Sequence, residues 1–348
     1  MMPELPPAAL RLRLDSAALA ANWTALDRLS GGARAGAAVK ADAYGLGAGR
    51  AVPVLADAGC TDWFVAHWCE AAALLDLVPA ARIAVLHGPL TGADAAFARA
   101  AGLRPVLNSL SQVARWLEAG GGACDLMVDT GMTRLGLAPA ELGDPLVARL
   151  AIDTLHSHLA DADDDSALNE RQRATFAAIR GQVHARRAAL ANSAGIALGA
   201  AYHFDLTRPG LALYGGVPRG ELADAIAQVA FPEAALIQVR DAAPGDTVGY
   251  NATFAVTRPM RVGLVALGYA DGLLRAWSDK AVLRLAGRAL PVIGRESMDM
   301  AAVDLAAAPD AREGDWLALD YALPEASATS GLSQYELLTL LGTRFSRD

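Results

Sequence analysis

The sequence predicts an α/β protein, a (β/α)8 TIM-type barrel followed by a smaller, mostly β C-terminal domain. From residue 36 onward, short β-like runs alternate with longer Ala/Leu/Arg-rich segments of helical character. After about residue 237 the segments become short and β-rich, and Gly and Pro separate them. The chain has 348 residues, enough for one large and one smaller domain. The expected domains are residues 1–237 and 238–348.

Eight runs in the first domain have the composition of short buried strands. They are Ala37–Lys40, Trp63–His67, Ile83–His87, Pro105–Asn108, Leu126–Asp129, Asp153–His158, Leu190–Ser193 and Phe204–Arg208. The helical segments include Arg50–Ala58, Glu70–Leu77, Ala93–Ala101, Leu110–Ala119, Pro139–Leu150 and Asn169–Ala188. A doubly wound open sheet is the alternative, but it usually has fewer units, and no GxGxxG follows the first strand.

The second domain is expected to be built from seven short strands and one closing helix. The strands are Ala235–Arg240, Thr247–Val256, Met260–Leu267, Ala281–Leu285, Leu290–Ile293, Met300–Leu305 and Asp315–Leu319. The helix is expected over Ser333–Leu341, with Ser333 as its N-cap and Glu336 completing a capping box. A further strand near Leu10–Leu14 could join either domain.

Composition excludes several classes of protein. A net charge of −8, spread along the chain, disfavours a nucleic-acid-binding protein. Three cysteines without CxxC spacing argue against a disulfide framework and fit a reducing compartment. The N-terminus lacks the pattern of a signal peptide, and no apolar stretch is long enough to span a membrane. The expected location is therefore the cytoplasm, with no membrane partner.

Lys40 is the most informative candidate for chemistry. It ends an apolar run and is followed by Gly45 and Gly47, so a buried strand is expected to deliver one amine into a site. Burial disfavours the charged ammonium, and a neutral amine can condense with a carbonyl group. The alternative is a strand-end lysine with its head in water.

Other candidates collect where a barrel places its chemistry. His158, Ser193 and Arg208 fall at the ends of candidate strands, and Arg134 lies in the loop after another strand. Barrel enzymes react at this C-terminal mouth. Burying these cationic groups together would be costly without a charged ligand.

Motifs along nearly the whole chain resemble those of the alanine racemase family. In the barrel they are Val39–Gly47, Val128–Gly136, His156–Ala160, Asn192–Gly195 and Arg208–Gly215. In the second domain they are Val248–Tyr250, Gly268–Gly272, Gly294–Arg295, Met298–Asp299 and Tyr335–Glu336. The resemblance implies an amino-acid racemase that uses pyridoxal 5'-phosphate.

The resemblance also implies a role for each matching residue in holding the cofactor. Lys40 would bind the aldehyde of pyridoxal phosphate, and Arg208 would face the pyridine nitrogen. His158 would lie beside the cofactor and activate the second base. The phosphate would be held by Tyr44, Ser193, the Gly210 and Leu211 backbone amides, and Tyr335, and Asn192 would also bind the cofactor.

Racemisation removes a proton from one face of Cα and returns one to the other face. The resemblance implies two bases, Lys40 and Tyr250 of the partner subunit, in a head-to-tail homodimer. Substrate would be bound by Arg134, Met298 and Asp299, and the entrance would be restricted by Tyr269, Arg295 and Asp163. The implied reaction interconverts L-alanine and D-alanine, supplying D-alanine for the bacterial cell wall. A racemase of broader range, acting for example on serine, or a role in alanine catabolism are the alternatives.

The chain departs from the family at Met127, where many members carry a carbamylated lysine that braces the arginine equivalent to Arg134. Methionine cannot form a carbamate, so we expect an anion or Asn108 to hold Arg134. His67, His87 and His158 could all face the barrel mouth and bind zinc. No carboxylate or cysteine spacing supports that alternative, so no metal is expected.

Two other functions fit the sequence less well. A non-enzymatic pyridoxal-phosphate-binding barrel would need neither the β domain nor Tyr250. A decarboxylase of the same barrel type would carry a late catalytic cysteine, whereas the last cysteine here is Cys124.

Overall fold

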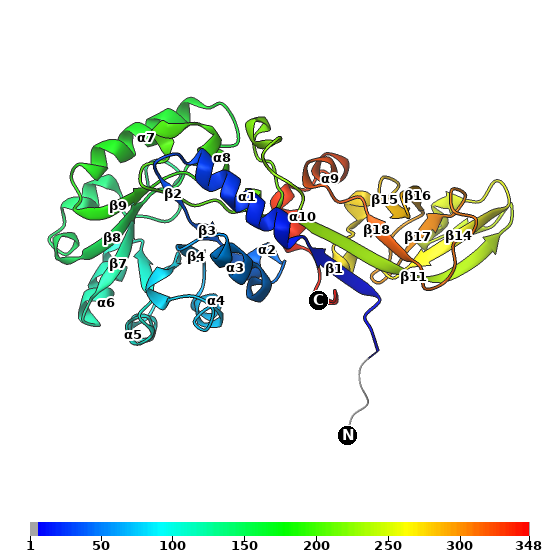
Figure 1. Cartoon of the computed structure of the whole chain (residues 1–348), viewed down its shortest axis with the longest axis horizontal. Helices are drawn as coiled ribbons and strands as arrows, with labels where there is room; N and C mark the ends of the chain where they lie inside the picture. Colours follow the sequence, from blue (N-terminus) through cyan, green and yellow to red (C-terminus); the bar gives the residue numbers. More distant parts are fainter. Residues whose placement is uncertain (1–5, 348) are drawn as a thin grey trace, which may run out of the picture. The chain divides into compact units, whose positions relative to one another are not determined.

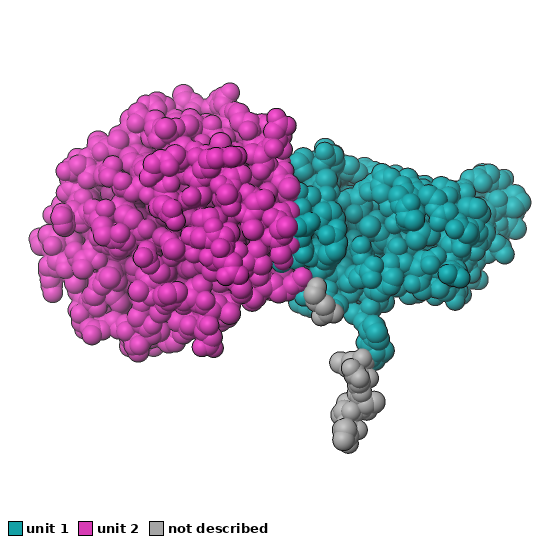
Figure 2. Space-filling view, viewed as in Figure 1, with its two compact units in different colours: residues 1–15, 228–348 teal, residues 16–227 magenta. Residues whose placement is uncertain are grey.

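The computed structural model describes residues 6–347. The chain forms two compact units: residues 16–227, and residues 228–348 together with residues 1–15 (Figure 2). The boundary expected at 237/238 falls inside one continuous strand, β11 (Ala230–Ala242). Strand β1 (Leu10–Leu14) pairs antiparallel with β11, from Leu10 opposite Ala234 to Leu14 opposite Ala230. The N-terminal strand therefore belongs to the C-terminal unit, because its hydrogen-bonding partner lies there.

The larger unit is the predicted parallel barrel (Figure 1). Seven strands form one parallel sheet in chain order: β3 (Ala37–Ala38), β4 (Trp63–Val65), β5 (Ile83–Val85), β6 (Arg104–Leu107), β7 (Ala123–Met127), β8 (Ala151–His156) and β9 (Ala185–Ala189). A second parallel pair joins β10 (Leu206–Thr207) to β2 (Arg34–Ala35). Backbone hydrogen bonds close the ring, from Asp205 N to Ala188 O (3.0 Å) and from Ala38 N to Pro209 O (2.9 Å). The (β/α)8 expectation is confirmed.

Helices surround this barrel on its outside (Figure 1). They are α1 (Ser16–Leu29), α3 (Ala48–Asp57), α4 (Trp68–Ala73), α5 (Gly92–Ala101), α6 (Leu110–Glu118), α7 (Ala167–Arg180) and α8 (Ser193–Ala197). The helix predicted over Pro139–Leu150 is wrong, because two short 3-10 turns, η2 (Pro139–Gly143) and η3 (Val147–Arg149), replace it. Pro145 lies between them and has no N–H to continue a helix.

One predicted strand is also displaced. The strand expected at Leu190–Ser193 is wrong, because the strand in this region, β9, ends at Ala189. The helix predicted over Asn169–Ala188 is wrong over its last residues, because they belong to β9. Arg186 and Arg187 occupy β9 and made it resemble an amphipathic helix. The Arg187 guanidinium donates to Asp62 (2.6 Å), so its charge is paired within the fold rather than left on a helix surface.

The smaller unit is an antiparallel β structure. Its main sheet has the order β1-β11-β14-β17-β16-β15-β18, and β11 also pairs with β18, so the strands from β11 to β18 close a ring. The further strands are β14 (Met260–Val265), β15 (Val282–Leu285), β16 (Arg288–Ile293), β17 (Ala301–Asp304) and β18 (Trp316–Leu319). Strands β12 (Thr247–Val248) and β13 (Phe254–Ala255) form a separate antiparallel pair. The mostly β character of this region is confirmed.

Two short helices complete the smaller unit, α9 (Leu323–Ser330) and α10 (Gln334–Thr339). The predicted capping box of α10 is present. Ser333 Oγ accepts from Glu336 N (3.2 Å), and the Glu336 carboxylate accepts from Ser333 N (2.8 Å). Within residues 6–347, no helix is both long and apolar enough to span a bilayer.

Candidate active site

Lys40 begins a left-handed turn directly after β3. Ala41, Asp42, Ala43 and Tyr44 all have φ between 53° and 57°, a region that is costly for residues with a Cβ. Glu70 holds this turn, because its carboxylate accepts from Ala41 N (2.6 Å) and also from backbone amides at the end of β4. The lysine side chain therefore projects from a backbone fixed to the neighbouring strand.

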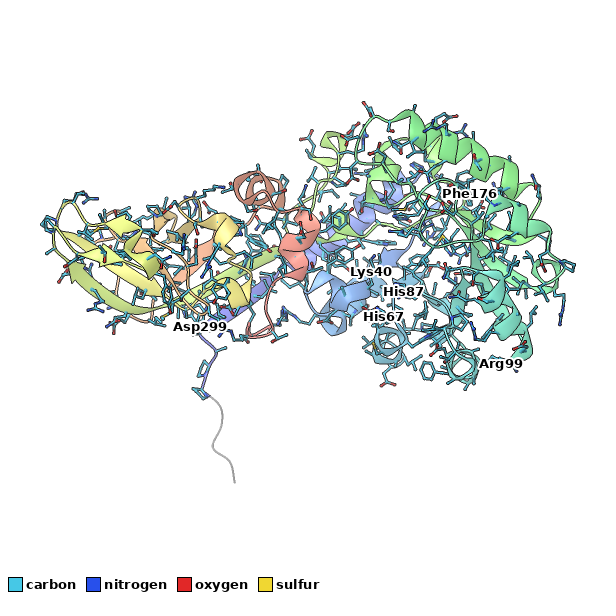
Figure 3. The ribbon with its side chains drawn as sticks, turned by 180° about the vertical axis from the view of Figure 1, so that it is seen from behind. Lys40, His67, His87, Arg99, Phe176 and Asp299 are labelled. Carbon is cyan, nitrogen blue, oxygen red and sulfur yellow. The ribbon has the colours of Figure 1, made fainter. Side chains whose placement is uncertain are left out.

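The environment of Lys40 makes its amine more nucleophilic. The side chain is half-buried at the C-terminal mouth of the barrel (Figure 3). Burial, and then the charge of Arg134, lower the pKa of Lys40, while Glu70 acts in the opposite direction. A larger share of neutral amine follows, as the sequence predicted.

Arg208 lies buried just beyond β10. Its Nη2 donates to Ser157 O (2.6 Å) and lies 3.5 Å from His158 Nδ1, while Nη1 lies 3.3 Å from His156 Nδ1. Burial lowers the pKa of Arg208 to about 10, so the guanidinium stays charged at neutral pH. Burial, and then the charge of Arg208, hold the pKa of His158 well below its ordinary value, which leaves His158 neutral.

Sequence reasoning missed the support behind Arg208. His156 Nε2 lies 3.1 Å from Asp125 Oδ2, and both side chains are fully buried. Burial lowers the pKa of His156 to about 4, although Asp125 opposes the shift. The sequence contains a pattern that could have predicted the role of His156, because His156 and His158 are two residues apart and so face the same side of an extended chain.

The loops after β9 and β10 present a set of small donors. Ser193 Oγ accepts from Gly210 N (3.0 Å) and Ala212 N (3.2 Å), and Asn192 caps α8 by accepting from Gly195 N (2.8 Å). Leu211 is buried between the two amides.

Tyr44 completes this set of donors. A Cβ added at Gly210 would lie 2.2 Å from Tyr44 Oη, so only glycine lets the phenol approach that backbone. Hydroxyls and backbone amides beside a helix start suit a phosphate group, and the residues present fit pyridoxal phosphate.

Arg134 lies in a loop shaped by Asp129, whose carboxylate accepts from Gly131 N (2.8 Å) and Arg134 N (3.1 Å). The side chain of Arg134 is exposed. Of the two groups expected to hold Arg134, an anion or Asn108, only Asn108 belongs to the chain, and its hydrogen bonds go to other residues. Asn108 Nδ2 donates to Leu86 O (2.9 Å), and Asn108 Oδ1 has no hydrogen-bond partner among residues 6–347.

Two of the remaining histidines touch each other at the mouth. The rings of His67 and His87, which follow β4 and β5, lie edge to face with centroids 4.4 Å apart (Figure 3). Over residues 6–347, no three His, Cys, Asp or Glu side chains are grouped to hold a metal ion.

In the smaller unit, Tyr250 begins a short turn, η7 (Tyr250–Ala252), between β12 and β13, and it is 64% exposed. Gly249 before it has φ 77°, and a Cβ there would lie 3.0 Å from Arg295 N. Tyr250 and Arg295 are therefore on adjoining loops. Exposure of a tyrosine to this degree is unusual for a packing residue.

The Met298 loop is close to the Tyr269 loop in the same unit. Ala270 N donates to Met298 O (3.0 Å), and a Cβ at Gly268 would lie 2.4 Å from that oxygen. Met298 is 53% exposed, and Asp299 pairs with Arg344 (2.6 Å). Of the other predicted residues, Tyr335 lies in α10, and Asp163 is exposed in a loop of the barrel unit.

These features define a class: a (β/α)8-barrel enzyme that can hold a phosphorylated carbonyl compound through a lysine. Residues 14–218 match the model described as "Alanine racemase, N-terminal domain", and residues 229–348 match "Alanine racemase, C-terminal domain". The chain belongs to the alanine racemase family.

Curated relatives and solved structures agree over nearly full length. The alanine racemase of Rhodospirillum rubrum is 44% identical, over 97% of this chain and 94% of its own, and that of Acidiphilium cryptum is 42% identical, over 97% of each. The crystal structure of alanine racemase from Bartonella henselae, with covalently bound pyridoxal phosphate, has a TM-score of 0.90 at 35% identity, covering 98% of this chain and 99% of that one. The biosynthetic alanine racemase of Pseudomonas aeruginosa has a TM-score of 0.87 at 35% identity, covering 97% and 98%.

Proposed function

We propose that this protein interconverts L-alanine and D-alanine with pyridoxal phosphate bound to Lys40. One observation carries the proposal: in a chain of the alanine racemase family, a half-buried amine with a lowered pKa shares a barrel mouth with a phosphate-sized set of donors. The aldehyde would bind the Lys40 amine. Tyr44, Asn192, Ser193, Gly210, Leu211 and Tyr335 would surround the phosphate.

When bound, pyridoxal phosphate withdraws electrons from the substrate and so acidifies its Cα hydrogen. Arg208 would limit the strength of this electron withdrawal. A guanidinium can only donate a hydrogen bond and does not release its proton at neutral pH, so a ring nitrogen facing Arg208 would stay unprotonated. Electron withdrawal would be restrained, which disfavours side reactions such as transamination.

Two bases would move the proton. The Lys40 amine would serve one face of Cα, and Tyr250 of the partner subunit would serve the other, in a head-to-tail homodimer. The 64% exposure of Tyr250 supports this role, because the phenol is available to a second chain. Because Arg208 can only donate to His158 Nδ1, neutral His158 would carry its proton on Nε2, and that N–H could donate to the phenol oxygen and so favour the phenolate.

The remaining predicted residues would position and select the substrate. Arg134 and the Met298 backbone amide would hold the carboxylate, with Asp299 beside them. Tyr269, Arg295 and Asp163 would restrict the entrance. The reaction in the direction of D-alanine would supply cell-wall synthesis in the cytoplasm.

Exchange with solvent tests the activity. Purified protein with pyridoxal phosphate and L-alanine in deuterated water should form D-alanine labelled at Cα. The Lys40→Ala variant should lose the visible absorbance of the lysine-bound cofactor. Turnover of serine without turnover of alanine would replace the proposal with a racemase of different range, and retention of the absorbance by Lys40→Ala would remove Lys40 from its role.

A further inference from the structure

A pocket lies at the opposite end of the barrel from Lys40. It has a volume of about 530 Å³, within the range of small-molecule sites. Its walls include Arg104 at the start of β6, Ala123 at the start of β7 and Arg186 near the start of β9. These are the N-terminal ends of the strands, whereas Lys40 and Arg208 follow C-terminal ends. Figure 3 labels Arg99, another lining residue, well away from Lys40.

Arginine dominates the lining. Arg82, Arg99, Arg104 and Arg186 line the pocket, and Asp153 is the only acidic residue in the lining described over residues 6–347. The buried indole of Trp116 and several alanines and glycines complete the walls. The pocket therefore carries a local excess of positive charge in a chain whose net charge is −8.

The carboxylates nearby are already shared. Asp153 accepts from Arg104 (3.0 Å), Arg186 (2.7 Å) and Arg187 (2.9 Å). Burial alone would raise the pKa of Asp153, but these guanidinium groups hold it well below its usual range. One carboxylate thus serves three cations and cannot neutralise the other arginines.

Two lining arginines are left with weak compensation. The nearest carboxylate oxygen to Arg82 is on Asp62, at 3.8 Å, and that aspartate already accepts from Arg187 at 2.6 Å. Arg99 donates to a carbonyl, Ala119 O (2.9 Å), and no ion pair joins it to an acid among residues 6–347. In Arg104, which is only 4% exposed, Nε and Nη2 have no hydrogen-bond partner in that range and face carboxylates only at ion-pair distance, Asp125 at 3.6 Å and Asp62 at 3.7 Å.

We propose that this pocket binds a small polyanion, a compound bearing phosphate or several carboxylate groups, with Arg82 and Arg99 as its main contacts and Arg104 as the charge behind them. Guanidinium groups recognise such oxyanions through paired N–H donors. The site is separate from the proposed racemase site and does not depend on it.

Calorimetric titration of the cofactor-loaded, full-length protein tests the proposal, with inorganic pyrophosphate and citrate as separate probes. Arg82→Gln and Arg99→Gln should each weaken binding several-fold, and the double variant should weaken it by about tenfold or more. Arg284→Gln is the matched control, because Arg284 pairs with Asp320 at the surface of the other unit. All four variants should still form D-alanine, and the binding should weaken as salt is raised.

Tighter binding of pyrophosphate would identify phosphate as the preferred group, and tighter binding of citrate would identify carboxylate. Equal affinity in the wild type and the double variant would overturn the proposal, since the anion would then bind elsewhere. Absence of binding of either probe by the wild type at about 10 mM would overturn it too.

Discussion

His156 accepts a hydrogen bond from Arg208, and this sets which of its nitrogens carries the proton. Arginine only donates, so His156 Nδ1, 3.3 Å from Arg208 Nη1, must be unprotonated. The Nε2–H then donates to Asp125 Oδ2 at 3.1 Å. Asp125 therefore holds the imidazole in the one tautomer that can support Arg208.

Asp125→Asn should disturb this arrangement. An amide can donate to His156 Nε2 and place a proton on Nδ1, where it would face the Arg208 donors. We expect a loss of about 1–3 kcal/mol in the free energy of unfolding and a clear fall in kcat. Urea unfolding and steady-state kinetics measure both, with Asp57→Asn on the exposed end of α3 as control. Wild-type kcat in Asp125→Asn would contradict the proposed tautomer.

The buried histidine also predicts how stability depends on pH. His156 has a folded pKa of about 4, below the ordinary value of 6.5, so the unfolded chain binds more protons between these values. Stability should therefore fall as pH falls from 6.5 to 4, by about 3 kcal/mol from this group. The free energy of unfolding, measured from pH 6.5 to 4, should depend less on pH in His156→Gln than in His184→Gln, a control at an exposed histidine. Equal slopes would show that His156 does not titrate this way.

Glu70→Ala should loosen the turn that carries Lys40. The carboxylate accepts from three backbone amides, at Ala41, Ala66 and His67, and so ties the left-handed turn to the end of β4. We expect a loss of about 1–3 kcal/mol in stability and weaker retention of pyridoxal phosphate. Thermal unfolding and cofactor release by dialysis measure these effects. Glu118→Ala, at the exposed end of α6, should change neither, and an unchanged Glu70→Ala would show that the turn holds its shape alone.

Mixing two inactive variants tests whether sites are shared between subunits. Lys40→Ala and Tyr250→Phe should each lose almost all turnover, the latter with its cofactor absorbance intact. In a mixed dimer with shared sites, one site contains both Lys40 and Tyr250. Full exchange of subunits should then restore about a quarter of wild-type activity. No recovery after verified exchange would mean that both bases come from one chain, or that Tyr250 is not a base.

Met127→Lys tests how Arg134 is held. Met127 is buried, and Gly136 in the Arg134 loop packs against it, since a Cβ there would lie 3.1 Å from Met127 Cγ. A lysine carbamate formed at this position in bicarbonate would add a negative charge beside the loop. We expect the KM for alanine to change several-fold in bicarbonate and less without it, while Met127→Leu stays near wild type. If the KM of Met127→Lys is the same with and without bicarbonate and equals that of the wild type, a charge at position 127 does not affect how Arg134 is held.

The local pattern of the chain was sufficient to predict much of this protein. Alternation of short apolar runs with helical segments predicts a parallel barrel, because each strand needs a crossover helix before the next parallel strand. The positions of Lys40 and Arg208 at or just beyond strand ends follow from the same alternation, whereas Ser193, expected to end a strand, begins α8. These features depend on neighbours in sequence, so a sequence carries them directly.

Other features were decided only by the tertiary structure. Asp125, His156 and Arg208 meet across separations of 31 and 52 residues, and nothing local to any of their segments predicts that contact. The N-terminal strand β1 joined the C-terminal unit because β11 offers it a pairing edge more than 200 residues away. The left-handed turn after Lys40 is held by Glu70 in the first turn of α4, which follows another strand. Such contacts depend on long-range geometry, which also buries His156 and so lowers its pKa. No local pattern of the sequence encodes that geometry.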